Sequence, residues 1–290
     1  MSILGALGFA RAVGIENNTS RCITFLSDFG LSDGYVASVK GVLKSLVPQV
    51  SVIDITHSIH PQDVQSAAFV LSTTAPYFHK KTIHLAVVDP GVGTDRQLLV
   101  VVCPLGVFVA PDNGLLSLVL KPYISDDKNN GKLVLNKQAS AVSLDNHKYH
   151  RNNPSPTFAG RDILAPVVAA LCNGVDICRI GTPLTEIVGL GLSDPVRQGN
   201  VITGQVLYID HFGNIITNIS KKDLPMSEET TVILGEKKIV GLGHTYADKN
   251  GLMALIQSNG YLEIALNGGN AALMTQTKVG NRVQVIIDKP

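Results

Sequence analysis

The chain has 290 residues, 45% of them hydrophobic, and its 24 Lys and Arg nearly balance its 23 Asp and Glu. A chain of this length can bury one large core or two moderate ones, and we expect two domains. The balanced charge gives no general attraction to nucleic acid or to an anionic membrane, and no stretch approaches the roughly 20 apolar residues that cross a bilayer. We therefore expect a soluble, cytoplasmic protein with neither partner.

Residues 1–20 lack the basic segment that opens a secretory signal, so they are expected to form an N-terminal extension. The four cysteines lie in or beside apolar runs, and their spacing does not give the close pairs of a zinc or redox site. They are Cys22, Cys103, Cys172 and Cys178. We expect buried, reduced thiols and no metal.

Residues 21–190 alternate short apolar runs with segments of helical period. This pattern predicts an α/β domain with a mostly parallel sheet. The polar stretch 125–153 predicts a loop-rich insert. Strands are expected at 23–26, 52–55, 83–88 and 98–103, and helices at 35–46, from near Pro61, at 115–120 and at 161–171.

The composition changes at 189–200, where Gly, Ser, Asp, Pro and Asn predict a linker. Beyond it, residues 200–290 carry short alternating apolar runs separated by Gly and Asn. Such runs are typical of an antiparallel β-barrel. They cover 201–209, 215–219, 231–234, 252–256, 261–265 and 283–287.

Two acidic loops follow expected inner strands. Asp28 comes directly after the first strand, and Asp89 comes directly after the run 83–88. Because ligands of parallel sheets bind at the carboxyl ends of strands, both acids are candidate site residues. Each also has a structural explanation, since Asp28 and Asp33 could cap the next helix and Asp89 could stabilise its own turn.

The spacing D-x-G-x-G at Asp89 also occurs after a strand in many methyltransferases. There the glycines lead into a helix, whereas 97–103 has the β-branched, aliphatic composition of a strand. A methyltransferase is therefore disfavoured. The chain contains no GxGxxG and no GxxxxGK[ST] motif, so NAD and nucleoside triphosphates are poor candidates for ligands.

Six separated motifs together resemble the adenosylmethionine hydrolase family, also called hydroxide adenosyltransferases, which is related to fluorinase and chlorinase. The motifs are S-D-F-G-L-S-D-G at 27–34, D-P-G-V-G at 89–93, P-D-N-G at 111–114, T-F-A-G-R-D at 157–162, D-H-F-G-N at 210–214 and N-G-G-N at 267–270. The resemblance runs from about Ile23 to Ile287. It implies hydrolysis of S-adenosyl-L-methionine (SAM) to adenosine and L-methionine without a cofactor. It also implies a homotrimer whose sites lie between the N-terminal domain of one subunit and the C-terminal domain of the next.

The resemblance assigns the chemistry to Asp89 and Arg96. In the family, an acid and an arginine at this spacing work with a histidine to orient the water that displaces methionine from C5′. The halogenating relatives carry a tyrosine in the loop of Asp89. Since the sulfonium is already a good leaving group, the main tasks are to align the water with the carbon and to give it negative character.

The resemblance also implies the binding residues. Asp28 is similar to the residue that grips the ribose hydroxyls, and Asp33 lies near the methionine moiety. Asp210 and Ser258 are similar to the residues that hold the amino and carboxylate groups of methionine. The remaining candidates for substrate binding are Gln62, Phe158, Phe212, Asn214, Asn259 and Gly268, of which Phe212, Asn214 and the backbone at Gly268 match the adenine pocket.

One position departs from the family pattern. The motif that normally reads T-F-H-G-R-D has Ala159 in place of the histidine. Three explanations remain open: a natural lineage that manages with Asp89 and Arg96, an engineered variant that traps ligand, or a protein that binds SAM or adenosine without turnover. His147 or His150 could also take over the role.

Overall fold

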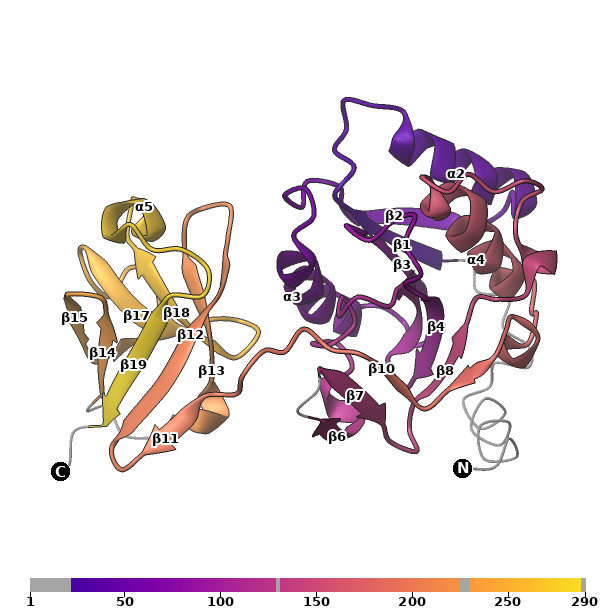
Figure 1. Ribbon diagram of the computed structural model, residues 1–290. Coiled ribbons are helices and arrows are strands. Elements are labelled where there is room, and N and C mark those ends of the chain that lie inside the picture. Colours follow the sequence, from indigo (N-terminus) through magenta and orange to yellow (C-terminus); the bar gives the residue numbers. More distant parts are fainter. Residues whose placement is uncertain (1–21, 129–130, 225–229, 288–290) are drawn as a thin grey trace. The chain divides into compact units, whose positions relative to one another are not determined.

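The computed structural model describes residues 22–128, 131–224 and 230–287 (Figure 1). The expected extension at 1–20 lies outside the described residues. The chain divides between Gly191 and Leu192 into two compact units, each with its own core. No described helix is long and apolar enough to cross a membrane.

The N-terminal unit contains a mixed seven-stranded sheet in the order β2-β1-β3-β5-β4-β8-β9. Strands β2, β1, β3 and β5 run parallel, and β4, β8 and β9 extend the sheet with antiparallel pairings. The expected α/β class is confirmed. The strands are β1 (Cys22–Ser27), β2 (Ser51–Thr56), β3 (Ile83–Val87), β4 (Leu98–Cys103), β5 (Gly106–Pro111), β8 (Ser140–Ser143) and β9 (Pro183–Leu184).

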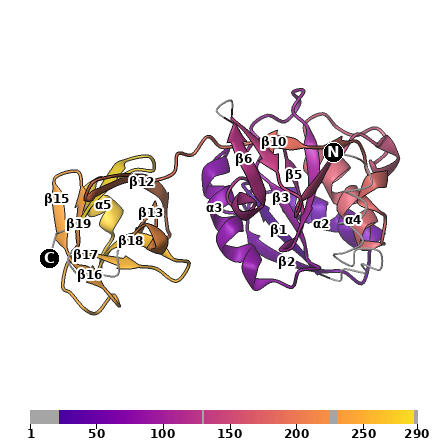
Figure 2. The same cartoon turned by 90° about the horizontal axis from the view of Figure 1, so that it is seen from below.

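Helices cover both faces of this sheet, as Figures 1 and 2 show. On one face, α2 (Tyr35–Leu46) and α4 (Ala165–Cys172) pack on apolar side chains that include Phe25 and Leu85. On the other face, α3 (Val64–Thr74) packs on the alternate residues, such as Leu26 and Ala86. Every residue of strand β3 is buried, and all of them except His84 are apolar, because both faces of the strand are covered.

A small sheet in the order β10-β7-β6 lies beside the main one. Its strands are β6 (Ile124–Lys128), β7 (Lys132–Leu135) and β10 (Glu186–Val188). The expected loop-rich insert at 125–153 is thus wrong in part, because it contains the hairpin β6-β7 and strand β8. Strand β8 pairs with β4 and carries the buried residues Ala141 and Val142.

Two other expectations are corrected. Residues 115–120 form consecutive turns rather than a helix, with a backbone bond from Ser117 N to the Gly114 carbonyl. Their apolar spacing reflects burial of the leucines, not a continuous helical ladder. Helix α3 begins at Val64 instead of near Pro61, because Gln62 has a positive φ of 69° and the Asp63 side chain caps the helix through Ser66 N.

The C-terminal unit is a nearly closed barrel in the order β15-β14-β19-β12-β13-β18-β17-β16, with β11 paired to β12 and β15 lying against β17. Except for the parallel pair β16-β17, neighbouring strands are antiparallel. The expected barrel is therefore confirmed. Its elements are β11 (Val196–Gln198), β12 (Val201–Ile209), β13 (Ile215–Ser220), β14 (Thr230–Leu234), β15 (Lys237–Val240), β16 (Leu242–Gly243), β17 (Leu252–Ile256), β18 (Tyr261–Leu266), α5 (Ala271–Thr275) and β19 (Arg282–Ile287).

Candidate functional site

Asp28 and Asp89 follow neighbouring strands at the same edge of the main sheet. Strands β1 and β3 are parallel, and Ser27 pairs with Val87 in register. The two loops therefore leave the sheet side by side. The Asn113 side chain supports this edge, since its Nδ2 donates to the carbonyl of Val88 at 2.8 Å.

Asp89 and Arg96 form a buried ion pair. Arg96 Nε lies 2.7 Å from Asp89 Oδ1 and 2.9 Å from Oδ2, and its Nη2 also binds Oδ2. The side chains are only 7% and 14% exposed. Because Arg96 lies at the other end of the same loop, the pair also closes the turn that begins at Asp89, and the structural explanation stays open. A charged acid is held in a fixed orientation by a two-point contact.

The T-F-A-G-R-D segment runs beside this pair's loop. A Cβ built at Gly93 would lie 3.5 Å from the carbonyl oxygen of Pro156, and one built at Gly160 would lie 3.3 Å from Val87 Cγ1. Ala159, next to Gly160, is only 6% exposed. The position where the family pattern has a histidine is thus buried at the end of β3.

His147 and His150 lie in the polar stretch that follows β8. Their Nδ1 atoms are 3.2 Å apart, and His150 Nε2 lies 3.1 Å from the Leu144 carbonyl. Burial and the neighbouring His147 lower the pKa of His150, so its neutral form is favoured. These polar contacts tie the pair to its own loop rather than to Asp89.

An aromatic cluster borders the same loops. The ring of Phe158 makes edge contacts with Phe29 at 5.8 Å and with Tyr35 at 5.4 Å, and the guanidinium of Arg161 lies 4.8 Å from its centre. Arg161 is in turn paired with the buried Asp162. The Arg161 hydrogen bond is the main reason why the pKa of Asp162 lies below its ordinary value.

Asp28 and Gln62 are brought together although 34 positions separate them. The Gln62 backbone N–H donates to Asp28 Oδ2 at 2.8 Å. Asp33 is exposed, and its carboxylate accepts from Ser32 Oγ at 3.4 Å. Neither acid caps α2, whose N-cap residue is Gly34 without a side-chain bond. The capping explanation is therefore wrong.

In the C-terminal unit, Asp210 organises the turn of the D-H-F-G-N motif. Its Oδ1 accepts from the backbone of Phe212 and Asn214, and its Oδ2 accepts from Asn214 Nδ2 at 3.0 Å. The Phe212 ring is 72% exposed. Gly213, with a φ of 84°, packs so tightly that a Cβ there would lie 2.0 Å from Asn270 Cγ. The D-H-F-G-N and N-G-G-N motifs are thus in direct contact.

Ser258 and Asn259 lie in the turn between β17 and β18. Both contact the Gln257 side chain, through Ser258 Oγ at 3.3 Å and Asn259 N at 2.9 Å. Gly268 follows β18 and has a φ of 69°, a conformation that suits glycine. Six of the predicted site residues therefore belong to each unit.

Some polar groups at these edges were not predicted. Glu263 in β18 is 4% exposed and accepts from Tyr246 Oη at 2.8 Å. Burial raises its pKa, and the nearby Asp210 raises it further. His57 is buried, with its Nδ1 2.7 Å from Ser27 Oγ and its Nε2 3.1 Å from Asp54 Oδ1. In the described part of the chain, no three His, Cys, Asp or Glu side chains are grouped to hold a metal.

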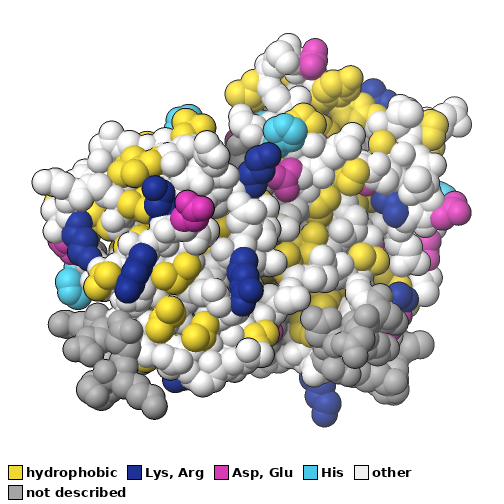
Figure 3. Space-filling view, turned by 60° about the vertical axis from the view of Figure 1, so that its left-hand side comes forward, with side chains coloured by type: hydrophobic (Ala, Val, Ile, Leu, Met, Phe, Trp, Pro, Cys, Tyr) yellow, Lys and Arg dark blue, Asp and Glu magenta, His cyan; other side chains and the backbone are white. Residues whose placement is uncertain are grey.

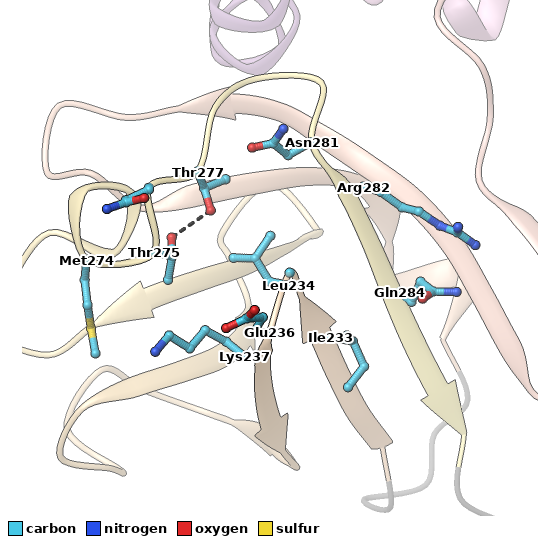
Figure 4. Close-up of a pocket in the computed structure, with 12 residues that line it drawn as sticks. Ile233, Leu234, Glu236, Lys237, Met274, Thr275, Thr277, Asn281, Arg282 and Gln284 are labelled. Carbon is cyan, nitrogen blue, oxygen red and sulfur yellow. Dashed lines mark hydrogen bonds between the residues drawn. The ribbon is translucent and has the colours of Figure 1, made fainter.

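A cavity of about 700 Å³ lies elsewhere in the C-terminal unit, between the β14-β15 hairpin, the end of α5 and β19 (Figure 4). Thr275 and Thr277 bond to each other at its wall. None of the predicted site residues lines it. On the face in Figure 3, Lys and Arg side chains stand apart and form no continuous basic patch among the described residues.

The thiols are as expected at two positions. Cys103 and Cys172 are buried, and burial raises the pKa of Cys103 to about 11 and that of Cys172 to about 12. Cys22 is partly exposed. Cys178 is exposed, against expectation, because it lies in a surface turn that the Asp176 side chain caps.

Two family models match in order along the chain. The SAM hydroxide adenosyltransferase N-terminal domain matches residues 23–181, and the C-terminal domain matches residues 204–284. The solved structure of an uncharacterised conserved protein from Thermotoga maritima is similar, with a TM-score of 0.80 and 34% identity over 91% of this chain and 99% of that one.

Curated relatives agree with the family models. An (R)-S-adenosyl-L-methionine hydrolase of Salinispora tropica is 36% identical over 91% of this chain and 97% of its own length. One from Methanocaldococcus jannaschii is 33% identical over 91% of this chain and 95% of its own length. A fluorinase of Nocardia brasiliensis is 29% identical over 93% of this chain and 98% of its own length. This chain belongs to the SAM hydroxide adenosyltransferase family.

Proposed function

We propose that this enzyme hydrolyses SAM to adenosine and L-methionine. The observation that carries the proposal is the buried Asp89–Arg96 pair at the carboxyl end of β3. Relatives that share 33–36% of their residues with it over most of their length are named (R)-S-adenosyl-L-methionine hydrolases.

The reaction is an in-line displacement at C5′ of the adenosyl group. A water oxygen forms the new bond to C5′, the C5′–S bond breaks, and its electron pair neutralises the sulfonium to the thioether of methionine. Asp89 orients the water and accepts its proton, while Arg96 fixes the carboxylate. The step uses no metal and no organic cofactor.

Asp89 also favours water over a halide as the nucleophile. The fluorinases among the relatives share 26–29% identity with this chain, less than the hydrolases do. An ionised carboxylate would repel an incoming halide, whereas it attracts the protons of water. We therefore expect no 5′-halogenated nucleoside when the enzyme turns over in chloride or fluoride.

Substrate binding uses both units. Asp28 grips the ribose hydroxyls, with Gln62 beside it, and Asp33 lies toward methionine. Asp210 and Ser258 hold the amino acid end, with Asn259 adjacent. A vicinal diol and an α-amino group both suit carboxylate acceptors. Phe158 borders the nucleoside, and the adenine pocket consists of Phe212, Asn214 and the Gly268 backbone.

A homotrimer with sites between subunits agrees with exposed apolar groups beside both sets of motifs. Leu31 is 75% exposed in the N-terminal unit, and Phe212 is 72% exposed in the C-terminal unit. Large apolar side chains at such positions are typical of surfaces that another chain or a ligand covers. We propose that the trimer acts in the cytoplasm.

Ala159 favours a second candidate, a protein that binds SAM or adenosine without turning it over. The buried position lacks the histidine that completes the family's catalytic group. The two candidates differ in a single-turnover experiment with enzyme in excess over SAM, followed by chromatography. Hydrolysis predicts adenosine and methionine in equal amounts, and the Asp89→Asn variant should form them far more slowly. Saturable binding with no product in the wild type would refute hydrolysis and support the binding protein.

A further inference from the structure

Four side chains form a chain of polar contacts beneath the S-D-F-G loop. Lys40 Nζ lies 2.6 Å from Asp54 Oδ2, and His57 Nε2 lies 3.1 Å from Asp54 Oδ1. His57 Nδ1 lies 2.7 Å from Ser27 Oγ. The residues come from α2, β2, the loop after β2 and the last position of β1. This series of contacts therefore runs from helix α2 to the end of β1, directly before Asp28.

The order Ser-His-Asp resembles a hydrolytic triad, but the burial excludes a nucleophile here. Ser27 is fully buried and His57 is 3% exposed. The His57 ring also packs edge-on against Phe25 at 4.6 Å. A catalytic serine has to reach the substrate, and Ser27 cannot. These four side chains can therefore affect ligand binding only through the residues whose positions they fix.

The direction of each hydrogen bond follows from Asp54. Burial raises the pKa of this carboxyl, but the hydrogen bond from Lys40 and the close contact with His57 outweigh it and keep the pKa below its ordinary value. An ionised Asp54, 3.1 Å from His57 Nε2 in a contact without hydrogen-bond geometry, attracts the imidazole proton to Nε2, which leaves Nδ1 to accept from the Ser27 hydroxyl. Ser27 Oγ then accepts from Phe29 N at 3.3 Å.

His57 also holds the far end of the same loop. Its carbonyl oxygen accepts from Gly30 N at 2.8 Å. The ring fixes Ser27 and the backbone fixes Gly30, so the two residues between them are held on both sides. Asp28 is one of these two, and its Oδ2 is further bonded to Gln62 N in the loop that follows His57.

We propose that His57, oriented by Asp54, is a positioning residue that holds the Asp28 carboxylate in place and thereby sets the preference for ligands with intact ribose hydroxyls. The inference rests on the role of Asp28 in the proposed function. It adds that the selectivity for the ribose diol depends on a buried contact that no ligand touches. Misplacing a binding group by about 1 Å can cost up to about 100-fold, so the effect should be measurable.

The test compares Ser27→Ala with a matched control on the same strand. Thr24 Oγ1 lies 2.8 Å from His84 Nδ1, and both residues are fully buried. Thr24→Val therefore removes the same kind of hydroxyl-to-histidine bond from β1, away from the loop. Calorimetry on the full chain measures the Kd of adenosine and of 2′,3′-dideoxyadenosine, which lacks both ribose hydroxyls, for each variant.

Ser27→Ala should weaken adenosine binding between about 10- and 100-fold and leave dideoxyadenosine binding unchanged. Thr24→Val should change neither Kd, although it lowers the melting temperature by a similar amount. Asp28→Ala should weaken adenosine binding as well, and adding Ser27→Ala to it should cost little more. In the His57→Ala background, Ser27→Ala should likewise have little further effect.

The proposal is overturned if Ser27→Ala weakens both nucleosides equally, if Thr24→Val has the same effect as Ser27→Ala, or if the losses of Ser27→Ala and Asp28→Ala add fully. It also falls if the wild type does not discriminate between the nucleosides. Failure of the proposed hydrolysis is distinct, because a chain that binds adenosine but forms no product from SAM still gives all of these Kd values.

Discussion

Replacing Asp89 by asparagine tests the buried pair and the chemistry together. The variant keeps the shape of the side chain but leaves the Arg96 guanidinium, only 14% exposed, beside a neutral amide. Removing one partner of a buried ion pair costs about 3–5 kcal/mol, and we expect the lower end, about 3 kcal/mol, because Arg96 keeps some contact with water. For a unit of this size, each kcal/mol lowers the melting temperature by about 2–4 °C, so the expected shift is about 6–12 °C.

Glu186→Gln is the matched control in the same unit. Glu186 pairs with Lys132, but their side chains are 31% and 48% exposed. An exposed pair contributes far less than a buried one, so the melting temperature of Glu186→Gln should fall much less than that of Asp89→Asn. Scanning calorimetry measures both variants, and chromatography of SAM turnover should show kcat about 10²–10⁴-fold lower for Asp89→Asn alone. Equal melting temperatures for the two variants would refute the burial of the pair, and an unchanged kcat would refute the role of Asp89.

Three further predictions concern single positions. Ala159→His should raise kcat for SAM without much changing the Kd, and its cost in stability should be about 1–3 kcal/mol because the site is packed; an unchanged kcat in turnover assays would argue against a catalytic histidine there. Burial raises the pKa of Glu263 above its ordinary 4.5, so the folded state loses stability as the pH rises from below 4.5 toward neutral. Glu263→Gln should therefore raise the melting temperature at pH 7 and leave it unchanged near pH 4, and an equal gain at both values would contradict this. Gly213→Ala should destabilise the barrel by more than about 1 kcal/mol, since the new Cβ would overlap Asn270. Gly260 has a similar φ of 83° but open space around it, so Gly260→Ala should lower the free energy of unfolding by less in the same thermal melts.

The parts of the fold that could be predicted are those where the spacing of apolar residues follows directly from which side chains are buried. Strand β3 was expected because both faces of 83–87 are buried, which leaves an apolar run that only His84 interrupts. The barrel strands were expected because one face is inside and one outside, which gives alternation. The same signal misled at 115–120, where four buried side chains at helical spacing belong to consecutive turns. Apolar spacing reports which side chains are inside, and it does not specify backbone hydrogen bonds.

The candidate site was predictable to a similar extent. The places of Asp28 and Asp89 follow from two parallel strands that end at one edge. The contacts of His57 could not be predicted. Its partner Ser27 lies 30 positions away and meets it through the pairing of β1 with β2, and Lys40 reaches Asp54 only through the packing of α2. The sequence around a single histidine does not indicate that it belongs to such a network of contacts.

The origin of the oxygen in the product tests the central claim most directly. Wild-type enzyme and SAM are incubated in water enriched in ¹⁸O, and the products are separated and weighed by mass spectrometry. Attack of water at C5′ predicts one heavy oxygen in the 5′-hydroxyl of adenosine and none in methionine. Heavy oxygen in methionine, or adenosine that carries no label, would contradict the mechanism.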